Sequence, residues 1–378
     1  MSGDGEHWDV IVVGAGIAGL SLAGELAASA RVLVLEREAQ SAYHASGRSA
    51  AVSVEPFSTD PVYALTRATT PFLERPPPDF SEHSLVSPRG FLVLARPGEE
   101  AGIDRFLGAW SARCPAIREL GEAEARQRVP VLRPGAAVRF ALDPAAVALD
   151  THGMLQGWTR RLRAGGGCLV TGAEVTSVLR RDGRFEVRWQ QGAARAPVLV
   201  NAAGAWASAF AALAGATAIR LVPHRRSAAI IAPPAGHDVS GWPMVVPVAE
   251  DFYFKPEGGR LMLSPADQTP SEPMDAWPED LDLAAAVERA EAVAELGVRR
   301  FESTWAGLRT FAPDRQLVLG WDPILPGFYW CAGQGGAGFQ SSAGAARWCA
   351  AELGVGAAPA GLEDDGFDAA RVRPDRFA

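Results

Sequence analysis

The sequence is poor in the features that would tie a protein to metals, disulfides, nucleic acids or membranes. Its four cysteines, Cys114, Cys168, Cys331 and Cys349, lie far apart without Cys-x-x-Cys or Cys/His spacing, so neither a zinc site nor a disulfide framework is expected. No run of Lys or Arg occurs and the net charge is -8, which argues against nucleic acid or an anionic membrane as the main partner. We expect a protein that acts on a small molecule.

Long apolar runs and a targeting signal are missing as well. No stretch approaches the ~20 apolar residues that cross a bilayer. The polar, acidic start MSGDGEHWD shows no secretory signal, and with the scattered cysteines it predicts a cytoplasmic location. There is no repeat of fixed period. The 378 residues, 48% of them hydrophobic, are enough for two domains or one large interleaved unit.

The most informative segment is residues 10–37. An apolar run precedes Gly14, Gly16 and Gly19, a helical spacing of Leu and Ala follows, and a second apolar run ends in Glu36. This order of strand, glycine turn, helix, strand and acid is typical of dinucleotide binding. Gly14 permits the turn, Gly16 lets the backbone approach a pyrophosphate, and Gly19 lets helix and strand pack closely. Glu36 would then face the adenosine ribose.

The layout beyond this segment favours a flavin over a nicotinamide cofactor. Regular strand and helix alternation breaks after Arg37, whereas an NAD dehydrogenase continues it over about 150 residues. Strands followed by small-residue turns and helices reappear at Val198–Asn201 and Phe328–Ala332, and the region 221–265 between them reads as short antiparallel strands. The second glycine-rich loop precedes a helix from about Gln340, whose N-terminus would stabilise an anionic reduced flavin. A plain flexible loop is the alternative.

Further elements follow from periodicity and from breakers. We expect a strand over 91–95 and strands around a turn at Asp182 and Gly183. Helices are predicted from Pro61 until the prolines near residue 76, and over 103–113, 119–128, 151–164 and 281–296.

A series of motifs runs in one order from residue 10 to about residue 345: GAGIAG, VLEREAQ, YHASGRSAA, SPR, VLVNAAGAW, HRRSA, FYFKP, TWAGLRTF and AGQGGAGFQ. Together they resemble the D-amino-acid oxidase and dehydrogenase family of FAD proteins, and most closely the bacterial D-arginine dehydrogenases. The resemblance implies an α/β fold in which a Rossmann-like FAD-binding domain of glutathione-reductase type is interleaved with an α+β substrate domain built on an antiparallel sheet. The implied FAD-binding domain comprises 1–56, 142–218 and 309–362, the substrate-binding domain comprises 57–141 and 219–308, and 363–378 would be a surface tail.

The resemblance also implies a noncovalently bound FAD. The residues that match the family's cofactor-binding positions are Gly14, Ala15, Gly16, Ile17, Ala18, Gly19, Glu36, Arg37, Gly47, Arg48, Ser49, Ala50, Ala51, Val175, Ala202, Gly204, Trp206, Gly335, Gly336, Ala337, Gly338, Phe339 and Gln340. No metal is implied.

The same resemblance assigns the substrate site. Arg226 and Arg309 match the pair that grips the substrate carboxylate, Tyr253 matches the tyrosine that hydrogen-bonds it, and Gly336 and Gln340 would border the amine. The chemistry agrees, because a planar guanidinium offers a carboxylate two parallel hydrogen bonds and so fixes its orientation. A surface or FAD-phosphate contact is the alternative for either arginine.

The chain departs from the D-arginine dehydrogenases around the side-chain pocket. Val52, Val54 and Phe57 replace a histidine, a threonine and a tyrosine, and Phe91 replaces the glutamate that receives the guanidinium. An unpaired guanidinium against such a wall would cost several kcal/mol, so we expect a neutral or hydrophobic side chain. A cation over the Phe91 ring, or Glu55 as a displaced acid, would keep arginine possible. Two further positions complete the expected pocket, Met244 and Val246.

The expected reaction is FAD-dependent oxidative deamination of a D-amino acid to a 2-oxo acid and ammonia. The amine must be neutral, burial and nearby Arg charge favour that form, and the motifs supply no obvious base. Three alternatives stay open: oxidation of a secondary amine such as sarcosine or another N-methyl amino acid, oxidation of a hydroxy acid, and a flavin-binding subunit without its own turnover. The electron acceptor, whether oxygen or a quinone, is not encoded in any residue we can identify.

Overall fold

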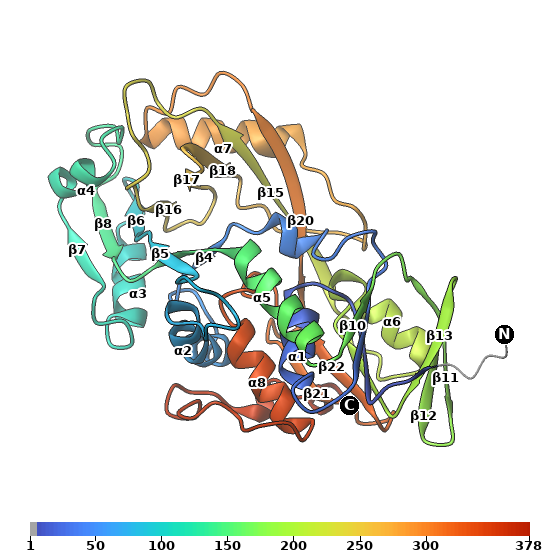
Figure 1. Ribbon diagram of the computed structural model, residues 1–378. Helices are drawn as coiled ribbons and strands as arrows, with labels where there is room; N and C mark the ends of the chain where they lie inside the picture. Colours follow the sequence, from blue (N-terminus) through green and yellow to red (C-terminus); the bar gives the residue numbers. More distant parts are fainter. Residues whose placement is uncertain (1–5) are drawn as a thin grey trace.

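The first βαβ unit forms where the glycine pattern predicts it. In the computed structural model, which describes residues 6–378, β2 (Val10–Val13) and β3 (Val32–Leu35) are fully buried parallel strands joined by α1 (Ile17–Leu26). Figure 1 shows α1 near the centre of the lower part of the molecule, beside α8 (Ser342–Glu352) and α5 (Thr151–Ala164). The apolar runs became strands because both of their faces are covered.

A six-stranded sheet collects segments from across the chain. The first five strands run parallel, and the last is antiparallel to its neighbour. Short parallel strands of this kind need crossover connections, so their neighbours come from distant parts of the sequence. In order, the strands are β10 (Cys168–Val170), β3, β2, β14 (Val198–Asn201), β22 (Phe328–Ala332) and β21 (Val318–Trp321).

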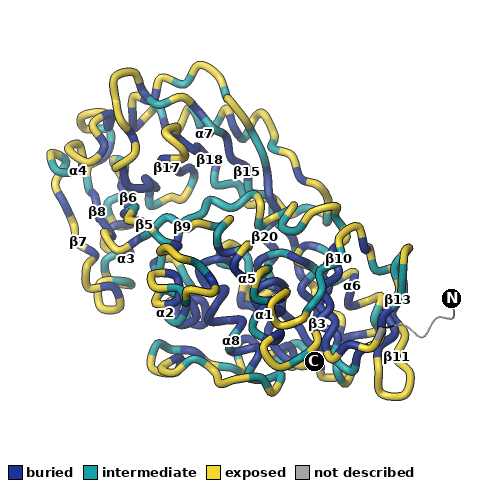
Figure 2. The backbone as a smooth tube through the Cα atoms, viewed as in Figure 1, coloured by how far each residue is buried: buried dark blue, intermediate teal, exposed yellow. Residues whose placement is uncertain are grey.

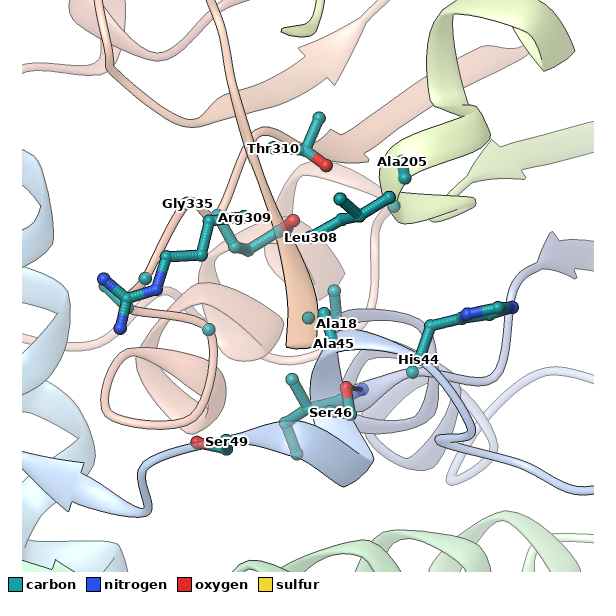
Figure 3. A pocket seen from close by; sticks show the side chains of 18 of the residues that line it. Ala18, His44, Ala45, Ser46, Ser49, Ala205, Leu308, Arg309, Thr310 and Gly335 are labelled. Carbon is teal, nitrogen blue, oxygen red and sulfur yellow. Dashed lines mark hydrogen bonds between the residues drawn. The ribbon is translucent and has the colours of Figure 1, made fainter. Parts of the chain in front are cut away.

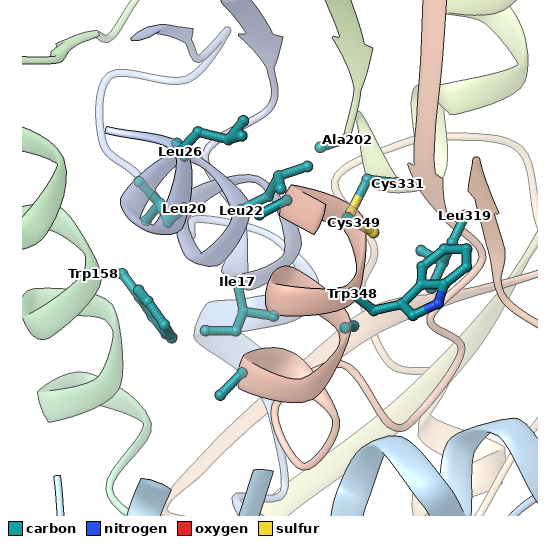
Figure 4. Close-up of a cluster of buried hydrophobic side chains, with 14 of the residues drawn as sticks. Ile17, Leu20, Leu22, Leu26, Trp158, Ala202, Leu319, Cys331, Trp348 and Cys349 are labelled. Atoms are coloured by element: carbon teal, nitrogen blue, oxygen red, sulfur yellow. The ribbon is translucent and has the colours of Figure 1, made fainter. Parts of the chain in front are cut away.

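The two faces of this sheet belong to different cores. Val10 and Val12 face α1, α5 and α8, whereas Ile11 and Val13 belong to the cluster on the opposite face. Figure 4 shows the first cluster, in which the leucines of α1 lie between Trp158 and the side chains of α8. Figure 2 shows the same buried centre as dark blue tube under exposed loops.

The second large sheet has nine strands and lies in the upper part of Figure 1. Helix α7 (Asp280–Val293) covers one of its faces through Ala286, Ala290 and Val293. The other face is turned toward the cofactor cavity described below. The strands are β19 (Thr269–Pro270), β15 (Val222–Ile231), β18 (Arg260–Ser264), β17 (Tyr253–Glu257), β16 (Met244–Pro247), β6 (Phe91–Ala95), β8 (Arg139–Asp143) and β7 (Arg118–Leu120), with β20 (Ser303–Phe311) paired to β15.

Two small sheets and several helices complete the fold. The four-stranded sheet is made of β1 (Glu6–His7), β13 (Gly192–Ala196), β12 (Arg184–Trp189) and β11 (Val175–Arg181), and the three-stranded sheet of β4 (Val52–Ser53), β9 (Val147–Leu149) and β5 (Val86–Pro88). The remaining helices are α2 (Asp60–Glu74), α3 (Ala101–Trp110), α4 (Glu122–Arg128), α6 (Ala207–Ala214) and the 3-10 turns η1 (Ala45–Arg48), η2 (Gly204–Trp206), η3 (Ala369–Arg371) and η4 (Pro374–Phe377).

The α/β fold class is confirmed, while some predicted elements are wrong in detail. The helix expected over 119–128 is a short strand, β7, followed by α4, because Leu120 pairs with Phe140 in the sheet. Sheet pairing here outweighs helical propensity. The TWAGLRTF motif, for which no strand was predicted, lies inside the long strand β20.

The C-terminal segment 363–378 is not the surface tail that its charge predicted. Val372 is fully buried and its carbonyl accepts a hydrogen bond from the Leu319 amide at 2.8 Å. Arg373 and Arg376 form ion pairs of 2.7 Å with Glu352 and Asp314. The few apolar residues between the charges, rather than the charges themselves, decide where this segment packs.

The division into two domains stays a prediction. Its expected boundaries at 141/142 and 308/309 fall inside β8 and β20, both strands of the nine-stranded sheet. Within residues 6–378 the structure has no helix long and apolar enough to span a membrane.

We predict that Val372→Ala lowers the free energy of unfolding by about 2 kcal/mol, because it leaves a cavity in a closed core. The matched change Leu281→Ala, at a side chain that is 84% exposed, should stay within about 0.5 kcal/mol. Chemical denaturation of both variants measures the difference. Equal effects would show that the C-terminal segment contributes nothing to the core.

Candidate active site

One cavity of about 820 Å³ lies where the glycine turn of the first βαβ unit meets the inner face of the nine-stranded sheet. Its lining residues come from most of the chain, from Val13 to Gln340. Figure 3 shows Leu308, Arg309 and Thr310 of β20 on one side and Ser46 and Ser49 on another. The volume is that of a site for a cofactor or drug-sized ligand.

The glycine turn forms a cradle that any side chain would fill. A Cβ on Gly14, whose φ is +106°, would lie 2.3 Å from the Ala202 carbonyl oxygen. A Cβ on Gly19 would lie 1.9 Å from the carbonyl oxygen of Gly14, so only glycine allows α1 to pack this close. Gly16 caps α1 without a side-chain hydrogen bond and lines the cavity. The positive end of the helix therefore points at the space where a pyrophosphate would bind.

Glu36 lies at the end of β3 as expected and is 8% exposed. Its carboxylate accepts hydrogen bonds from the Ala15 amide at 2.8 Å and the Glu38 amide at 3.0 Å, which fixes it at the cavity wall. Nearby, the Arg37 guanidinium lies 4.6 Å from the Trp206 ring centroid. These residues fit the ribose and adenine end of a dinucleotide.

The C-terminal glycine loop closes the cavity next to Arg309. A Cβ on Gly336 would lie 3.1 Å from the Nη1 atom of Arg309, and one on Gly335, whose φ is +53°, would lie 2.3 Å from the Phe311 ring. The loop therefore needs glycines to approach β20 this closely. Helix α8 starts directly after it, as predicted.

Arg226 and Arg309 lie on one face of the nine-stranded sheet. Arg226 pairs with Gly307 across β15 and β20, and Arg309 is two residues further along β20, so the two side chains are diagonal neighbours on the same face. The glycine opposite Arg226, Gly307, lets η1 approach β20, since a Cβ there would lie 3.3 Å from the Cβ of Arg48. Val245 pairs with Phe254, which places the flanking Tyr253 on the cavity side of the sheet.

The electrostatics of this cluster favour an anion. Loss of hydration and the like charge of Arg226 lower the pKa of Arg309 to about 10, although part of its guanidinium faces the open cavity. Burial raises the pKa of Tyr253, but the charges of Arg309 and Arg226 outweigh it and lower that pKa overall. Arg226 is oriented by a 2.7 Å hydrogen bond from its Nε to the Asp267 carbonyl. A carboxylate placed here would relieve the repulsion between the arginines.

An apolar wall adjoins the cluster on the same sheet face. Phe91 and Met244 are register partners in β6 and β16, and both line the cavity with Val246. The Phe57 ring packs edge-on against Phe91 with centroids 5.9 Å apart. The four positions that depart from the D-arginine dehydrogenases, Val52, Val54, Phe57 and Phe91, all line this one cavity.

Backbone strain concentrates around the cavity. Within residues 6–378, seven non-glycine residues have positive φ, and all except Asp182 line the cavity. Each such conformation costs about 1 kcal/mol or more and persists only where the surroundings enforce it. The six cavity residues are Ala42, Ala51, Phe57, Glu250, Ala266 and Arg315.

Some residues that match the family's cofactor or substrate positions do not line the cavity, and others line it but are also bonded to the rest of the protein. Ala15, Gly19 and Gly47 do not line it. The Arg48 guanidinium donates to the Ala306 carbonyl at 2.8 Å and pairs with Asp275, so its charge is already engaged. All the other matched residues line the cavity: Gly14, Gly16, Ile17, Ala18, Glu36, Arg37, Ser49, Ala50, Ala51, Val175, Ala202, Gly204, Trp206, Gly335, Gly336, Ala337, Gly338, Phe339 and Gln340.

The Gln340 amide holds a loop in place. Its Oε1 accepts from the Val54 amide at 3.3 Å, and its Nε2 donates to the Val54 carbonyl and to the Thr66 hydroxyl, both at 3.2 Å. It thereby joins the C-terminal glycine loop to the segment that carries Phe57. A role in orienting that segment is what these contacts support.

Glu250, and not Glu55 as the sequence suggested, is the acid that lines the cavity near the two arginines. Glu55 does not line the cavity, and its carboxylate accepts a hydrogen bond from the Cys114 thiol at 3.4 Å. Glu250 lines it, in the turn between β16 and β17. The acidic residues directly before the FYFKP motif could have drawn attention to Glu250, which belongs to none of the matched motifs. Within residues 6–378 no group of three or more metal-ligating side chains occurs.

We predict that Gly14→Ala abolishes FAD retention, because the new methyl group meets the Ala202 carbonyl oxygen at the turn. The control is Gly98→Ala, which has a similar φ of +90°, meets no atom within 4 Å and lies outside the cavity. The ratio of flavin to protein after purification measures the effect. Normal flavin content in Gly14→Ala would contradict the assigned cofactor cradle.

Comparisons with known proteins show to which family the chain belongs. The FAD dependent oxidoreductase family model, DAO, matches residues 9–352. The chain is 25% identical to bovine FAD-dependent oxidoreductase domain-containing protein 1 over 90% of this chain and 80% of that one, and 24% identical to mouse mitochondrial sarcosine dehydrogenase over 62% of this chain and 26% of that one. Glycine oxidase from Geobacillus kaustophilus superposes with a TM-score of 0.80 at 22% identity over 96% of both chains. The chain belongs to the DAO family of FAD-dependent oxidoreductases.

Proposed function

We propose that the protein catalyses the FAD-dependent oxidative deamination of a D-amino acid with a neutral or hydrophobic side chain, giving a 2-oxo acid and ammonia. The observation that supports this most is the shared sheet face on which Arg226, Arg309 and Tyr253 adjoin the apolar wall of Phe91, Met244 and Val246. A carboxylate and an apolar side chain on one carbon would contact these two regions together.

The roles of the side chains follow from that geometry. Arg226 and Arg309 would bind and orient the carboxylate, and Tyr253 would donate a hydrogen bond to it. FAD, bound noncovalently along the glycine cradle, supplies the acceptor for the hydride from Cα. The apolar wall gains roughly 25 cal/mol for each Å² of substrate surface that it buries. Because the substrate would be held in one orientation, part of the entropy cost of aligning its Cα with the flavin would already be met by binding.

The resemblance to D-arginine dehydrogenases supports a D-amino acid, but the wall argues against arginine itself. Phe91 lies where those relatives have a glutamate, and Glu55 is turned toward Cys114. A guanidinium in contact with this wall would lack a carboxylate partner there.

Oxidation of a secondary amine such as sarcosine is the second candidate, supported by the similarity to sarcosine dehydrogenase. The same arginines would bind its carboxylate, so the site does not separate the two reactions. Formaldehyde as product in place of ammonia would identify it. A flavin-binding subunit without turnover is disfavoured, because it has no need of convergent arginines facing the cavity.

We predict that D-Phe, D-Leu and D-Met reduce the flavin in anaerobic stopped-flow mixing, and that D-Arg does so at least about tenfold more slowly. Absorbance of the oxidised flavin measures each rate, with L-amino acids, N-methyl amino acids and hydroxy acids in the same panel. Fastest reduction by N-methyl substrates would replace deamination by the second candidate.

Phe91→Glu serves as the paired variant in that experiment. Restoring an acid at this position should raise the rate with D-Arg relative to D-Phe by about tenfold or more. An unchanged ratio would show that Phe91 does not face the substrate side chain.

We also predict that carboxylate binding weakens at high pH. The guanidinium of Arg309 binds a carboxylate in its charged form, so the affinity is full below a pKa of about 10 and falls as the pH rises through it. Tyr253 acts in the same direction, because its lowered pKa brings a repelling phenolate. Titration of 3-phenylpropanoate between pH 7 and 11, followed by flavin absorbance, measures this loss. In Tyr253→Phe, only the loss of affinity that comes from Arg309 should remain. A wild-type affinity that stays constant up to pH 11 would contradict the prediction.

A further inference from the structure

Glu250 places a carboxylate in the cavity, and the proposed function gives this carboxylate no role. The turn that carries it is held from outside, because Asp251 pairs with Arg96 at 3.0 Å and its carbonyl accepts a hydrogen bond from Arg289 at 2.9 Å. Glu250 itself has a φ of +50°, a conformation that an L residue adopts only when it is enforced. The turn therefore holds this side chain toward the cavity at a steric cost.

The other carboxylates of the cavity already have partners. Glu174 pairs with Arg37 at 3.2 Å and Asp314 with Arg376 at 2.7 Å. Glu36 accepts two backbone amides at the opposite, adenosine end. Within residues 6–378, Glu250 forms no ion pair within 4 Å, although it is exposed and lines the same cavity as the arginines that would hold the substrate. A cationic group of a bound substrate would neutralise the charge of the Glu250 carboxylate.

We propose that Glu250 receives the ammonium group of the substrate and accepts its proton before the hydride leaves Cα. The inference rests on the proposed function, in which the substrate enters as a zwitterion and reacts as a neutral amine. One N–H bond breaks and one O–H bond forms, so that an ammonium and a carboxylate become an amine and a carboxylic acid. Since Glu250 is exposed, the proton then passes to water.

The surroundings of Glu250 act on its pKa in both directions, and the net effect is a raised pKa. Partial loss of hydration raises the pKa of Glu250, while Arg226 of β15, Arg315 after β20 and Arg309 of β20 act against that rise. Tyr253 of β17 and Asp267 after β18 are the other titratable groups around this cluster, and both act on Arg309. A substrate carboxylate on the arginines would neutralise part of their charge and raise the pKa of Glu250 further.

The kinetic test compares Glu250→Gln with Glu288→Gln, which removes an equal charge from the exposed face of α7. The rate of flavin reduction is measured with D-Phe from pH 6.5 to pH 10. At pH 7 Glu250→Gln should reduce about 100-fold more slowly, and at pH 10, where the free amine is already neutral, it should approach the wild-type rate. Glu288→Gln should follow the wild type throughout. A Glu250→Gln profile that is lowered equally at every pH, or unchanged, would overturn the proposal.

A binding test separates this inference from the proposed function. D-α-methylphenylalanine keeps the ammonium and carboxylate but has no transferable hydrogen, and 3-phenylpropanoate lacks the amine. By calorimetry, Glu250→Gln should bind the first about tenfold more weakly and the second at least as tightly as the wild type. Equal losses for both ligands, or none for either, would overturn the role of Glu250. If no amino acid reduces the wild-type flavin, the deamination proposal fails while this comparison still decides whether Glu250 binds the amine.

Discussion

Two guanidinium groups of like charge face one cavity, and the chemistry of the site depends on the anion that they require. Arg226 and Arg309 are diagonal neighbours on paired strands, so the register of β15 and β20 keeps their backbone positions adjacent on one face of the sheet. Burial and, after it, the like charge of Arg226 lower the pKa of Arg309. The protein tolerates this repulsion because the sheet is held from its other face by α7 and its apolar contacts. A carboxylate relieves the repulsion, which makes substrate binding part of the electrostatic balance of the site.

In the proposed function, the same sheet face would also decide the substrate selectivity. Because side chains alternate along a strand, residues two apart share a face, and neighbouring strands place the apolar Phe91, Met244 and Val246 beside Tyr253 and the arginines. The cavity is thus polar at one region and apolar at the next. Glycines on the facing elements, at Gly14 and Gly336, bring backbone rather than side chains to the opposite wall. Residues of both glycine segments line the cavity and would hold a flavin there.

The sequence predicted the buried strands well and the exposed connections poorly. β6, β14, β22 and α5 have the predicted bounds, because uninterrupted apolar runs or a full helical period have few alternatives. β20 was not predicted, since a glycine and an arginine interrupt its pattern and only its pairing with β15 makes it a strand. Likewise, Val372 is buried by contacts with the distant Leu319 that no local pattern contains.

The candidate site divides in the same way. The cofactor cradle could be predicted from Gly14, Gly16, Gly19 and Glu36, because its chemistry is local in the chain. Arg226 and Arg309 came only through resemblance, since nothing in either segment shows that the two meet.

The role of Glu250 and the contacts that Gln340 makes with a distant loop could not be predicted from the sequence, and the reason is physical. Glu250 is directed by a left-handed backbone conformation and by the arginines that hold Asp251, and Gln340 acts through contacts with Val54 and Thr66. Both depend on turns, where strain and long-range hydrogen bonds rather than hydrophobic periodicity set the structure. The six non-glycine residues with positive φ around the cavity therefore lie where the surrounding sheets must enforce the backbone conformation. For the proposed function, the sheet supplies the arginines and the apolar wall, while the connections outside it position Phe57 and Glu250 at the cavity.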